Sequence, residues 1–264
     1  MTRKSKYSII SILLLTVMFL FTPATRMTVD AANKLFSVIV LTKYNQTMSI
    51  GDEFQLIAVT SNGKKPTFKS SKSSIASVNT YGLITAKKAG TCKITAKIKN
   101  AEASCNITVR PTTVTIRPSS LSLYRLGTKQ LTASVSTGHT PTWRSSKSSV
   151  AVVDENGMVT AVKHGTAKIT ATVDGTSTTC TITVKQPTIR LSASTLALTV
   201  GETRTLSARV SSGNTPEWTT SNSNVVNIDA NGNITALKKG RAYVYAREDG
   251  IKTSCIVTVS EPAP

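Results

Sequence analysis

The sequence predicts an all-β protein of three tandem β-sandwiches, and three observations support this fold class. First, a segment of about 75 residues, the size of a small domain, occurs three times, and Cys105, Cys180 and Cys255 mark the same place in each copy. Second, the last part of each copy alternates apolar and polar residues, as strands with one buried face do. Third, no stretch after Ala32 shows the 3.6-residue period of an amphipathic helix.

The repeat is defined by residues that shape turns and cores. Each copy carries a proline, an aromatic residue two positions later, and two glycines at matching places. These are Pro66, Phe68, Gly82 and Gly90 in the first copy, Pro141, Trp143, Gly157 and Gly165 in the second, and Pro216, Trp218, Gly232 and Gly240 in the third. We expect the aromatic side chain to fill the core of its copy, because a large ring buries the most apolar surface.

The first 31 residues have the features of a secretory signal peptide. A basic start with Arg3, Lys4 and Lys6 precedes an apolar run over residues 7–21, which is short for a membrane span, and small residues follow at 31–32. An uncleaved N-terminal anchor is the alternative, and it is the only way in which we expect the protein to contact a membrane. Either reading predicts an extracellular or cell-surface location.

Short strand-like runs follow one another along the middle copy. Residues 117–119 separate the first two runs, Gly127 precedes the third, and the polar turn 154–157 precedes the sixth. Seven or so short strands at this spacing favour a two-sheet sandwich. The expected strands are 113–116, 121–124, 130–135, 142–144, 150–153, 158–162, 167–173 and 179–184.

The last two of these runs form the clearest hairpin. Residues 167–173 place apolar side chains at odd positions, and residues 179–184 place them at even positions, so each strand has one inner face. Asp174-Gly175 between them is a strong signal for a tight hairpin turn.

Domain boundaries follow from the repeat. We expect a signal peptide over 1–31 and domains over 34–110, 112–185 and 187–260, joined by the short proline-containing linkers 110–112 and 185–187. Proline fixes the backbone angle φ, so these linkers are stiff. Three domains joined end to end by stiff linkers predict an elongated rod.

The middle copy resembles a known domain family. From Trp143 to Ala171 it reads W-x-S-S-x-x-x-V-A-x-V-D-x-x-G-x-V-T-A-x-x-x-G-T-A-x-I-T-A, which is similar to the group 2 bacterial immunoglobulin-like domain. The preceding Leu-x-Leu-x-x-x-Gly-x-x-x-Leu segment from Leu121 to Leu131 also fits, whereas the first copy departs with Phe68 in place of tryptophan. The resemblance covers residues 34–260. It implies immunoglobulin-like sandwiches that serve as spacer or adhesion modules, as in the surface proteins intimin and invasin.

The sequence offers no catalytic constellation. No catalytic triad, paired-carboxylate motif or phosphate-binding loop is present, so we expect no enzyme activity, no cofactor and no metal site. His139 and His164 lie in predicted loops and are not repeated in the other copies. Residues 154–156 offer oxygen atoms for calcium, but the spacing of an EF-hand is absent, which favours a simple polar turn.

Cys92 and Cys105 are a candidate disulfide, because exported proteins often contain such bonds. If residues 99–100 form the turn of the hairpin, Cys92 faces Ile107 and Cys105 faces Ile94. The two cysteines are then diagonal neighbours up to about 7–8 Å apart, whereas a disulfide needs Cβ atoms about 3.8 Å apart. This register favours free thiols.

The protein is strongly basic, with a formal net charge of +19. Lysines are concentrated in the first copy, and they either protect strand edges and keep the protein soluble or bind an anionic polymer. These lysines are Lys64, Lys65, Lys69, Lys72, Lys87, Lys88, Lys93 and Lys97.

The third copy alone carries aromatic residues on the outer face of its hairpin. Tyr243 and Tyr245 lie between Arg241 and Arg247, and the hairpin turn places Ile256 opposite Tyr243. These five residues, hereafter the tyrosine patch, either contact a partner or a sugar, or form cross-strand pairs that steady the sheet.

These observations predict an exported, non-enzymatic structural or adhesion protein of the cell surface that associates with anionic cell-wall polymers. The alternative is a secreted carbohydrate-binding module that uses the tyrosine patch. The expected partners are a wall polymer, a polysaccharide or a surface protein. Nucleic acid is not expected, because export separates the protein from it and aromatic residues for base stacking are scarce.

Overall fold

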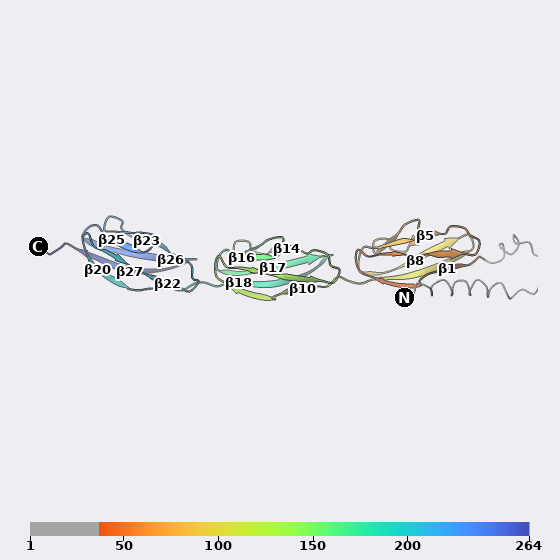
Figure 1. Cartoon of the computed structure of the whole chain (residues 1–264), viewed down its shortest axis with the longest axis horizontal. Helices are drawn as coiled ribbons and strands as arrows, with labels where there is room; N and C mark the ends of the chain where they lie inside the picture. The colour runs from red at the N-terminus through yellow and green to blue at the C-terminus, as the bar shows by residue number, and fades with distance from the viewer. Residues whose placement is uncertain (1–36, 264) are drawn as a thin grey trace, which may run out of the picture. The chain divides into compact units, whose positions relative to one another are not determined.

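A computed structural model describes residues 37–263, in which all regular secondary structure is β-strand. The predicted signal peptide, residues 1–31, lies outside the described residues. In the part of the chain that is described, no helix is long and apolar enough to cross a membrane. The strands fall into three sets of nine that follow the three sequence copies, which confirms the all-β fold class (Figure 1).

The first set lies within the first copy. Its strands are β1 Ile39–Leu41, β2 Asn45–Met48, β3 Glu53–Gln55, β4 Ala58–Thr60, β5 Thr67–Ser70, β6 Ala76–Val78, β7 Leu83–Ala86, β8 Gly90–Ile98 and β9 Ala101–Val109.

The second set follows the same order in the middle copy. Its strands are β10 Val114–Arg117, β11 Ser120–Leu123, β12 Thr128–Gln130, β13 Thr132–Val135, β14 Thr142–Ser145, β15 Ala151–Val153, β16 Met158–Ala161, β17 Gly165–Val173 and β18 Thr176–Val184.

The third set repeats the pattern once more. Its strands are β19 Ile189–Leu191, β20 Thr195–Thr199, β21 Thr203–Thr205, β22 Ala208–Val210, β23 Glu217–Thr220, β24 Val226–Ile228, β25 Asn233–Ala236, β26 Gly240–Glu248 and β27 Ile251–Ser260.

Each set builds one sandwich with the same topology. In the second set a four-stranded sheet, in the order β11-β18-β17-β14, faces a three-stranded sheet, β12-β16-β15, and a two-stranded sheet, β10-β13. The four-stranded sheet contains the long hairpin, and its edge strand β11 runs parallel to β18. The core between the sheets is apolar, and Ile169, Cys180 and Ile182 in it are fully buried.

The hairpin register agrees with the sequence prediction. Ile169 lies opposite Cys180, and the turn residues Asp174 and Gly175 both have positive φ angles, 49° and 77°. Side chains alternate between the core and the outer face along both strands. The outer face of this sheet is therefore fixed by the local pattern of apolar and polar residues.

One predicted strand is divided in the structure. Residues 130–135 alternate like a single strand, but β12 pairs with β16 whereas β13 pairs with β10. Between them the amide of Leu131 donates a hydrogen bond to the carbonyl of Gly157 at 2.9 Å, and the Leu131 side chain is 1% exposed. The prediction of one strand was wrong because alternation does not report which sheet a residue pairs with.

The repeated aromatic residue packs over a repeated glycine. Trp143 is partly buried against the core, and a Cβ atom built on Gly157 would lie 2.8 Å from its Cζ2 atom and 2.9 Å from the Leu131 carbonyl oxygen. The positive φ of Gly157, 84°, also favours glycine. The shared spacing of these two residues therefore has a steric cause.

Leu126 occupies a backbone conformation that glycine adopts in the other copies. Its φ is 68°, and the equivalent residues Gly51 and Gly201 have φ angles of 91° and 87°. The side chain is 62% exposed, so it contributes little burial. We expect Leu126→Gly to raise the free energy of unfolding of the second sandwich by about 0.5–1 kcal/mol, because it relieves the cost of a left-handed leucine. Urea unfolding measures this change, and a loss of stability would contradict it.

Backbone contacts group the chain into two units, residues 1–111 and residues 112–264. The first unit holds the first sandwich, and the second unit holds the second and third sandwiches. The proposed domain ranges 34–110, 112–185 and 187–260 each enclose one set of nine strands and one hydrophobic core.

Candidate functional site

The tyrosine patch lies on the outer face of the four-stranded sheet of the third sandwich. Tyr243 and Tyr245 project from β26 with ring centroids 6.3 Å apart and an angle of 11° between the ring planes. Tyr243 is 39% exposed and lies opposite Ile256 of β27, as the sequence predicts. The two rings are stacked and form a small aromatic platform on the sheet.

Cations cover the ends of this platform. The guanidinium carbon of Arg241 lies 5.8 Å from the ring centre of Tyr243, and that of Arg247 lies 5.9 Å from Tyr245. Lys252 on β27, which the sequence analysis did not select, places its ammonium group 4.6 Å from the ring centre of Tyr245. Cation–π attraction orders these side chains and gives the platform positive ends.

The lysines of the first sandwich are all exposed, but they form two groups. Lys69 on β5 lies beside Thr95 of β8, which is flanked by Lys93 and Lys97, so these three share the outer face of the sheet. The group is hereafter the lysine face. Lys97 has one carboxylate partner, Glu102 at 3.9 Å, and both side chains are largely exposed. Such a pair is weak, and it leaves the lysine face positive.

The other lysines lie in loops. Backbone hydrogen bonds join the loop of Lys72 to that of Lys87 and Lys88 through Ile75, so these three lie near one end of the sandwich. Lys64 and Lys65 precede β5, and the ammonium group of Lys65 lies 4.3 Å from the ring centre of Tyr81.

A charged junction joins the second and third sandwiches. The Nε atom of Arg125 lies 2.9 Å from Oε1 of Glu248, whose side chain is only 1% exposed. Asn214 Nδ2 donates hydrogen bonds to the same Oε1 atom at 3.1 Å and to the Arg125 carbonyl at 3.0 Å. The buried carboxylate thus has a cation and an amide as partners, as burial of a charge requires.

A histidine and an aspartate form a second contact across this junction. The amide of His164 donates to Oδ2 of Asp249 at 2.8 Å, and Nδ1 of His164 lies 3.2 Å from Oδ1. The Asp249 side chain is 2% exposed. The hairpin turn of the third sandwich is therefore held against a loop of the second.

The corresponding turn of the second sandwich is held differently. Asp174 accepts hydrogen bonds from Thr112 at 2.8 Å and Thr137 at 3.0 Å, and Nδ1 of His139 lies 2.9 Å from Oδ1. Burial acts to raise the pKa of Asp174, but the hydrogen bonds from His139, Thr112 and Thr137 and the charge of His139 outweigh it, so the pKa lies below its ordinary value. These contacts stay within one sandwich.

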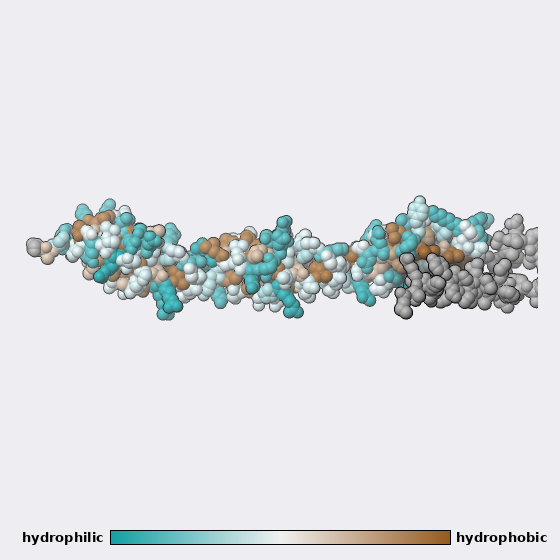
Figure 2. Space-filling model, in the orientation of Figure 1, coloured by the Kyte–Doolittle hydropathy of each residue, from teal (hydrophilic) through white to brown (hydrophobic). Residues whose placement is uncertain are grey.

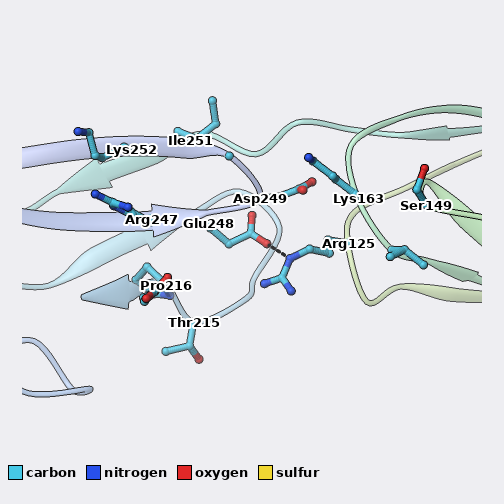
Figure 3. A pocket seen from close by; sticks show the side chains of 13 residues that line it. Arg125, Ser149, Lys163, Thr215, Pro216, Arg247, Glu248, Asp249, Ile251 and Lys252 are labelled. Atoms are coloured by element: carbon cyan, nitrogen blue, oxygen red, sulfur yellow. Dashed lines mark hydrogen bonds and ion pairs between the residues drawn. The ribbon is translucent and has the colours of Figure 1, made fainter. Parts of the chain in front are cut away.

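A pocket of about 950 Å³ opens at the junction. Figure 3 shows Arg125 and Lys163 directed into it from the second sandwich and Glu248 from the third, whereas the side chains of Arg247 and Lys252 extend away from the junction along the third sandwich. Its lining surface is about evenly polar and apolar, and Arg247 and Lys252 also contact the ring of Tyr245. The pocket and the tyrosine patch are therefore neighbours.

The polar turn at residues 154–156 shows turn chemistry. Oδ1 of Asp154 accepts hydrogen bonds from the amides of Asn156 at 2.9 Å and Met158 at 2.8 Å. Within residues 37–263 no group of three histidine, cysteine, aspartate or glutamate side chains is placed to hold a metal ion.

All four cysteines are buried free thiols. Cys92 lies opposite Ile107 and Cys105 opposite Ile94, the diagonal register that the sequence predicts. Burial raises the pKa of Cys105, and the neighbouring Cys92 adds to this effect; burial also raises the pKa of Cys180 and Cys255. The thiolate fraction is therefore small in the folded protein.

We expect four free thiols per chain when the protein is denatured without reductant, because the Cys92–Cys105 register does not suit a disulfide. Titration with a thiol reagent in denaturant measures this number, and Cys92→Ala, the residue of the other copies, serves as a control with three. A count of two in the natural chain would show that the candidate disulfide forms.

The sequence did not predict the junction, although one residue pointed to a buried charge. Glu248 stands at an inward position of β26 where the other copies have Ile98 and Val173. A carboxylate at an inward position of an alternating strand implies a buried partner. Nothing in the sequence identified that partner as Arg125, which is 123 residues away.

Comparison with known proteins places this fold in a family. The model of the bacterial Ig-like domain (group 2) matches residues 23–109 and 186–257, and a bacterial Ig-like domain model matches residues 139–186. The group 2 model covers more than half of the chain. The chain therefore belongs to the bacterial Ig-like domain (group 2) family, and its sandwiches are tandem immunoglobulin-like domains.

The chain matches parts of two longer proteins. An uncharacterized protein of Clostridium acetobutylicum is 43% identical over 131 residues, which is 45% of this chain and 14% of that protein. Ice-binding protein 1 of Shewanella frigidimarina is 25% identical over 261 residues, which is 86% of this chain and 29% of that protein. The chain thus spans less than a third of the length of either relative.

Among solved structures, the I9–I11 tandem of titin has a TM-score of 0.51 at 13% identity. The match covers 85% of this chain and 100% of the titin chain. This likeness shows the fold alone, a tandem of immunoglobulin-like domains. A C-terminal fragment of intimin bound to a receptor domain is 19% identical with a TM-score of 0.30, over 60% of this chain and 67% of the fragment.

Proposed function

We propose that this protein is an exported, non-enzymatic structural or adhesion module of the cell surface, and that its basic surface associates with anionic cell-wall polymers. Membership of the bacterial Ig-like family supports the surface role. The lysine face supports the proposal that the ligand is an anionic polymer. Lys69, Lys93 and Lys97 lie on one exposed sheet face, with a single weak carboxylate partner among the described residues. Figure 2 shows mainly hydrophilic and neutral residues on the view of the described chain, with separate hydrophobic areas.

Binding to isolated cell walls tests this proposal. We expect the full chain to be retained at low salt and released as salt rises, because added ions screen exposed charges within about 10 Å at 0.1 M and about 3 Å at 1 M. The triple variant Lys69→Gln, Lys93→Gln, Lys97→Gln should lose most of the retention. Lys129→Gln, Lys147→Gln, Lys168→Gln removes the same charge from the second sandwich as a control. Retention that does not respond to salt, or equal losses in both variants, would contradict the proposal.

The second candidate function is carbohydrate binding through the tyrosine patch. The stacked, partly exposed rings of Tyr243 and Tyr245 favour it, because an aromatic platform with polar edges suits a sugar ring. The other interpretation is that the rings only steady the sheet. Tyr243→Lys with Tyr245→Thr installs the residues of the second copy at these positions, so the strand should still form. Loss of binding on a glycan array at unchanged stability would support the carbohydrate function, and unchanged glycan binding would refute it.

A further inference from the structure

The junction pocket is lined by several cations. Lys163, Arg247 and Lys252 line it, and none of the three has a carboxylate within ion-pair distance among residues 37–263. Two of the acidic residues in the lining are already paired: Glu248 with Arg125, and Asp249 with His164. Glu217 is the remaining acidic residue of the lining.

The pocket is formed by two domains that buried contacts hold together. Lys163 comes from the loop that follows β16 in the second sandwich, whereas Arg247 and Lys252 face one another on β26 and β27 of the third. The His164–Asp249 contact joins the same two segments, and the Arg125–Glu248 contact joins the hairpin to the loop between β11 and β12. Because these contacts fix the loop of Lys163 relative to the hairpin, Lys163 lines one side of the pocket while Arg247 and Lys252 line the other.

The aromatic platform continues the pocket. Arg247 and Lys252 line the pocket and also lie over the ring of Tyr245, which stacks on Tyr243. A ligand that fills both places needs acidic groups for the cations and apolar C–H groups for the exposed parts of the tyrosine rings. Chains of acidic sugars have both features, whereas a simple polyanion lacks the C–H groups and a neutral glycan lacks the charge.

Among the three copies, this combination is found in the third alone. The positions of Arg247 and Lys252 are occupied by Thr172 and Ser177 in the second copy, and those of the two tyrosines by Lys168 and Thr170. The first copy has Lys97 and Glu102 in place of Arg247 and Lys252.

We propose that the junction pocket and the tyrosine patch together bind an acidic polysaccharide, with carboxylates on Lys163, Arg247 and Lys252 and a sugar ring on the tyrosines. This proposal builds on the surface function proposed above and names the ligand class of its second candidate. It makes Lys163 of the second sandwich part of a site whose aromatic residues belong to the third.

Titration of the full chain with a soluble oligogalacturonate tests the site. We expect Lys163→Gln to weaken binding about tenfold, as loss of one charge-assisted contact does. Lys168→Gln, which removes the same charge from the outer face of the same sandwich, should leave binding within about twofold. Both lysines are exposed, so neither variant should alter folding. Equal effects of the two variants would overturn the proposal.

Two further probes separate the contributions of charge and ring. The methyl-esterified oligosaccharide keeps the sugar rings without the charges, and a linear polyphosphate of matched charge supplies charges without rings. We expect each to bind at least about tenfold more weakly than the oligogalacturonate. Equal binding of the polyphosphate would overturn the role of the tyrosines, and equal binding of the neutral sugar would overturn the role of the cations.

The outcome can be distinguished from that of the wall-binding experiment. Walls that retain the protein through the lysine face, together with oligogalacturonate binding that does not respond to Lys163→Gln, would contradict only the junction site. Walls that do not retain the protein would contradict the proposed wall association and leave the binding of soluble oligosaccharide to decide the site.

Discussion

Arg125→Ala will loosen the junction between the second and third sandwiches, because it removes the cation that compensates the buried Glu248 carboxylate. Breaking one side of a fully buried ion pair costs about 3–5 kcal/mol. The Arg125 side chain is 33% exposed, so we expect a smaller loss of about 2–3 kcal/mol from the docked state. Hydrogen exchange at the His164 amide, which donates across the junction to Asp249, should become about 30- to 150-fold faster.

Two variants serve as controls for this prediction. Arg144→Ala removes an exposed arginine from β14 of the same sandwich and should not change exchange at His164. Adding Glu248→Val, the residue of the second copy, removes the unpaired buried charge. The exchange rate of the His164 amide in the double variant should therefore be closer to that of the natural chain than the rate in Arg125→Ala alone. Equal exchange in Arg125→Ala and Arg144→Ala would show that the ion pair does not hold the junction.

Gly157→Ala will destabilise the second sandwich by about 2–5 kcal/mol. A left-handed alanine costs about 1–2 kcal/mol, and the added methyl group would overlap Trp143 and the Leu131 carbonyl, which adds about 1–3 kcal/mol of overpacking. Urea unfolding followed by Trp143 fluorescence measures the change. The chain has two tryptophans, so Trp218→Phe, which introduces the residue type that the first copy has at Phe68, makes Trp143 the only reporter.

Gly138→Ala is the matched control for this substitution. Gly138 has a similar φ of 75°, but a Cβ atom there would meet nothing within 4 Å. We expect the free energy of unfolding to fall by only about 1 kcal/mol, which is the cost of the positive φ angle alone. If Gly157→Ala and Gly138→Ala lowered the stability equally, close contact between Trp143 and Gly157 would not explain the shared spacing of these two residues.

Much of the fold was predictable because local patterns encode it. The repeat defined the three sandwiches, alternation defined which side chains face the core, and Asp174-Gly175 defined the register of the long hairpin. The same logic placed Tyr243 opposite Ile256 on the outer face of the third sandwich. The division of residues 130–135 between two sheets was missed, because alternation records the face of a strand and not its partner.

The sequence by itself determined the class of fold, the buried positions and the basic, aromatic outer faces, since each depends on neighbours within one hairpin or one copy. Only the tertiary structure decided how Arg125 meets Glu248, how His164 meets Asp249, and that Lys163 lies in one pocket with Arg247 and Lys252. These pairs join loops and strand ends of different copies. Their contact depends on how one folded domain docks on the next, and that docking is set by complementary charge and shape rather than by any periodic pattern along the chain.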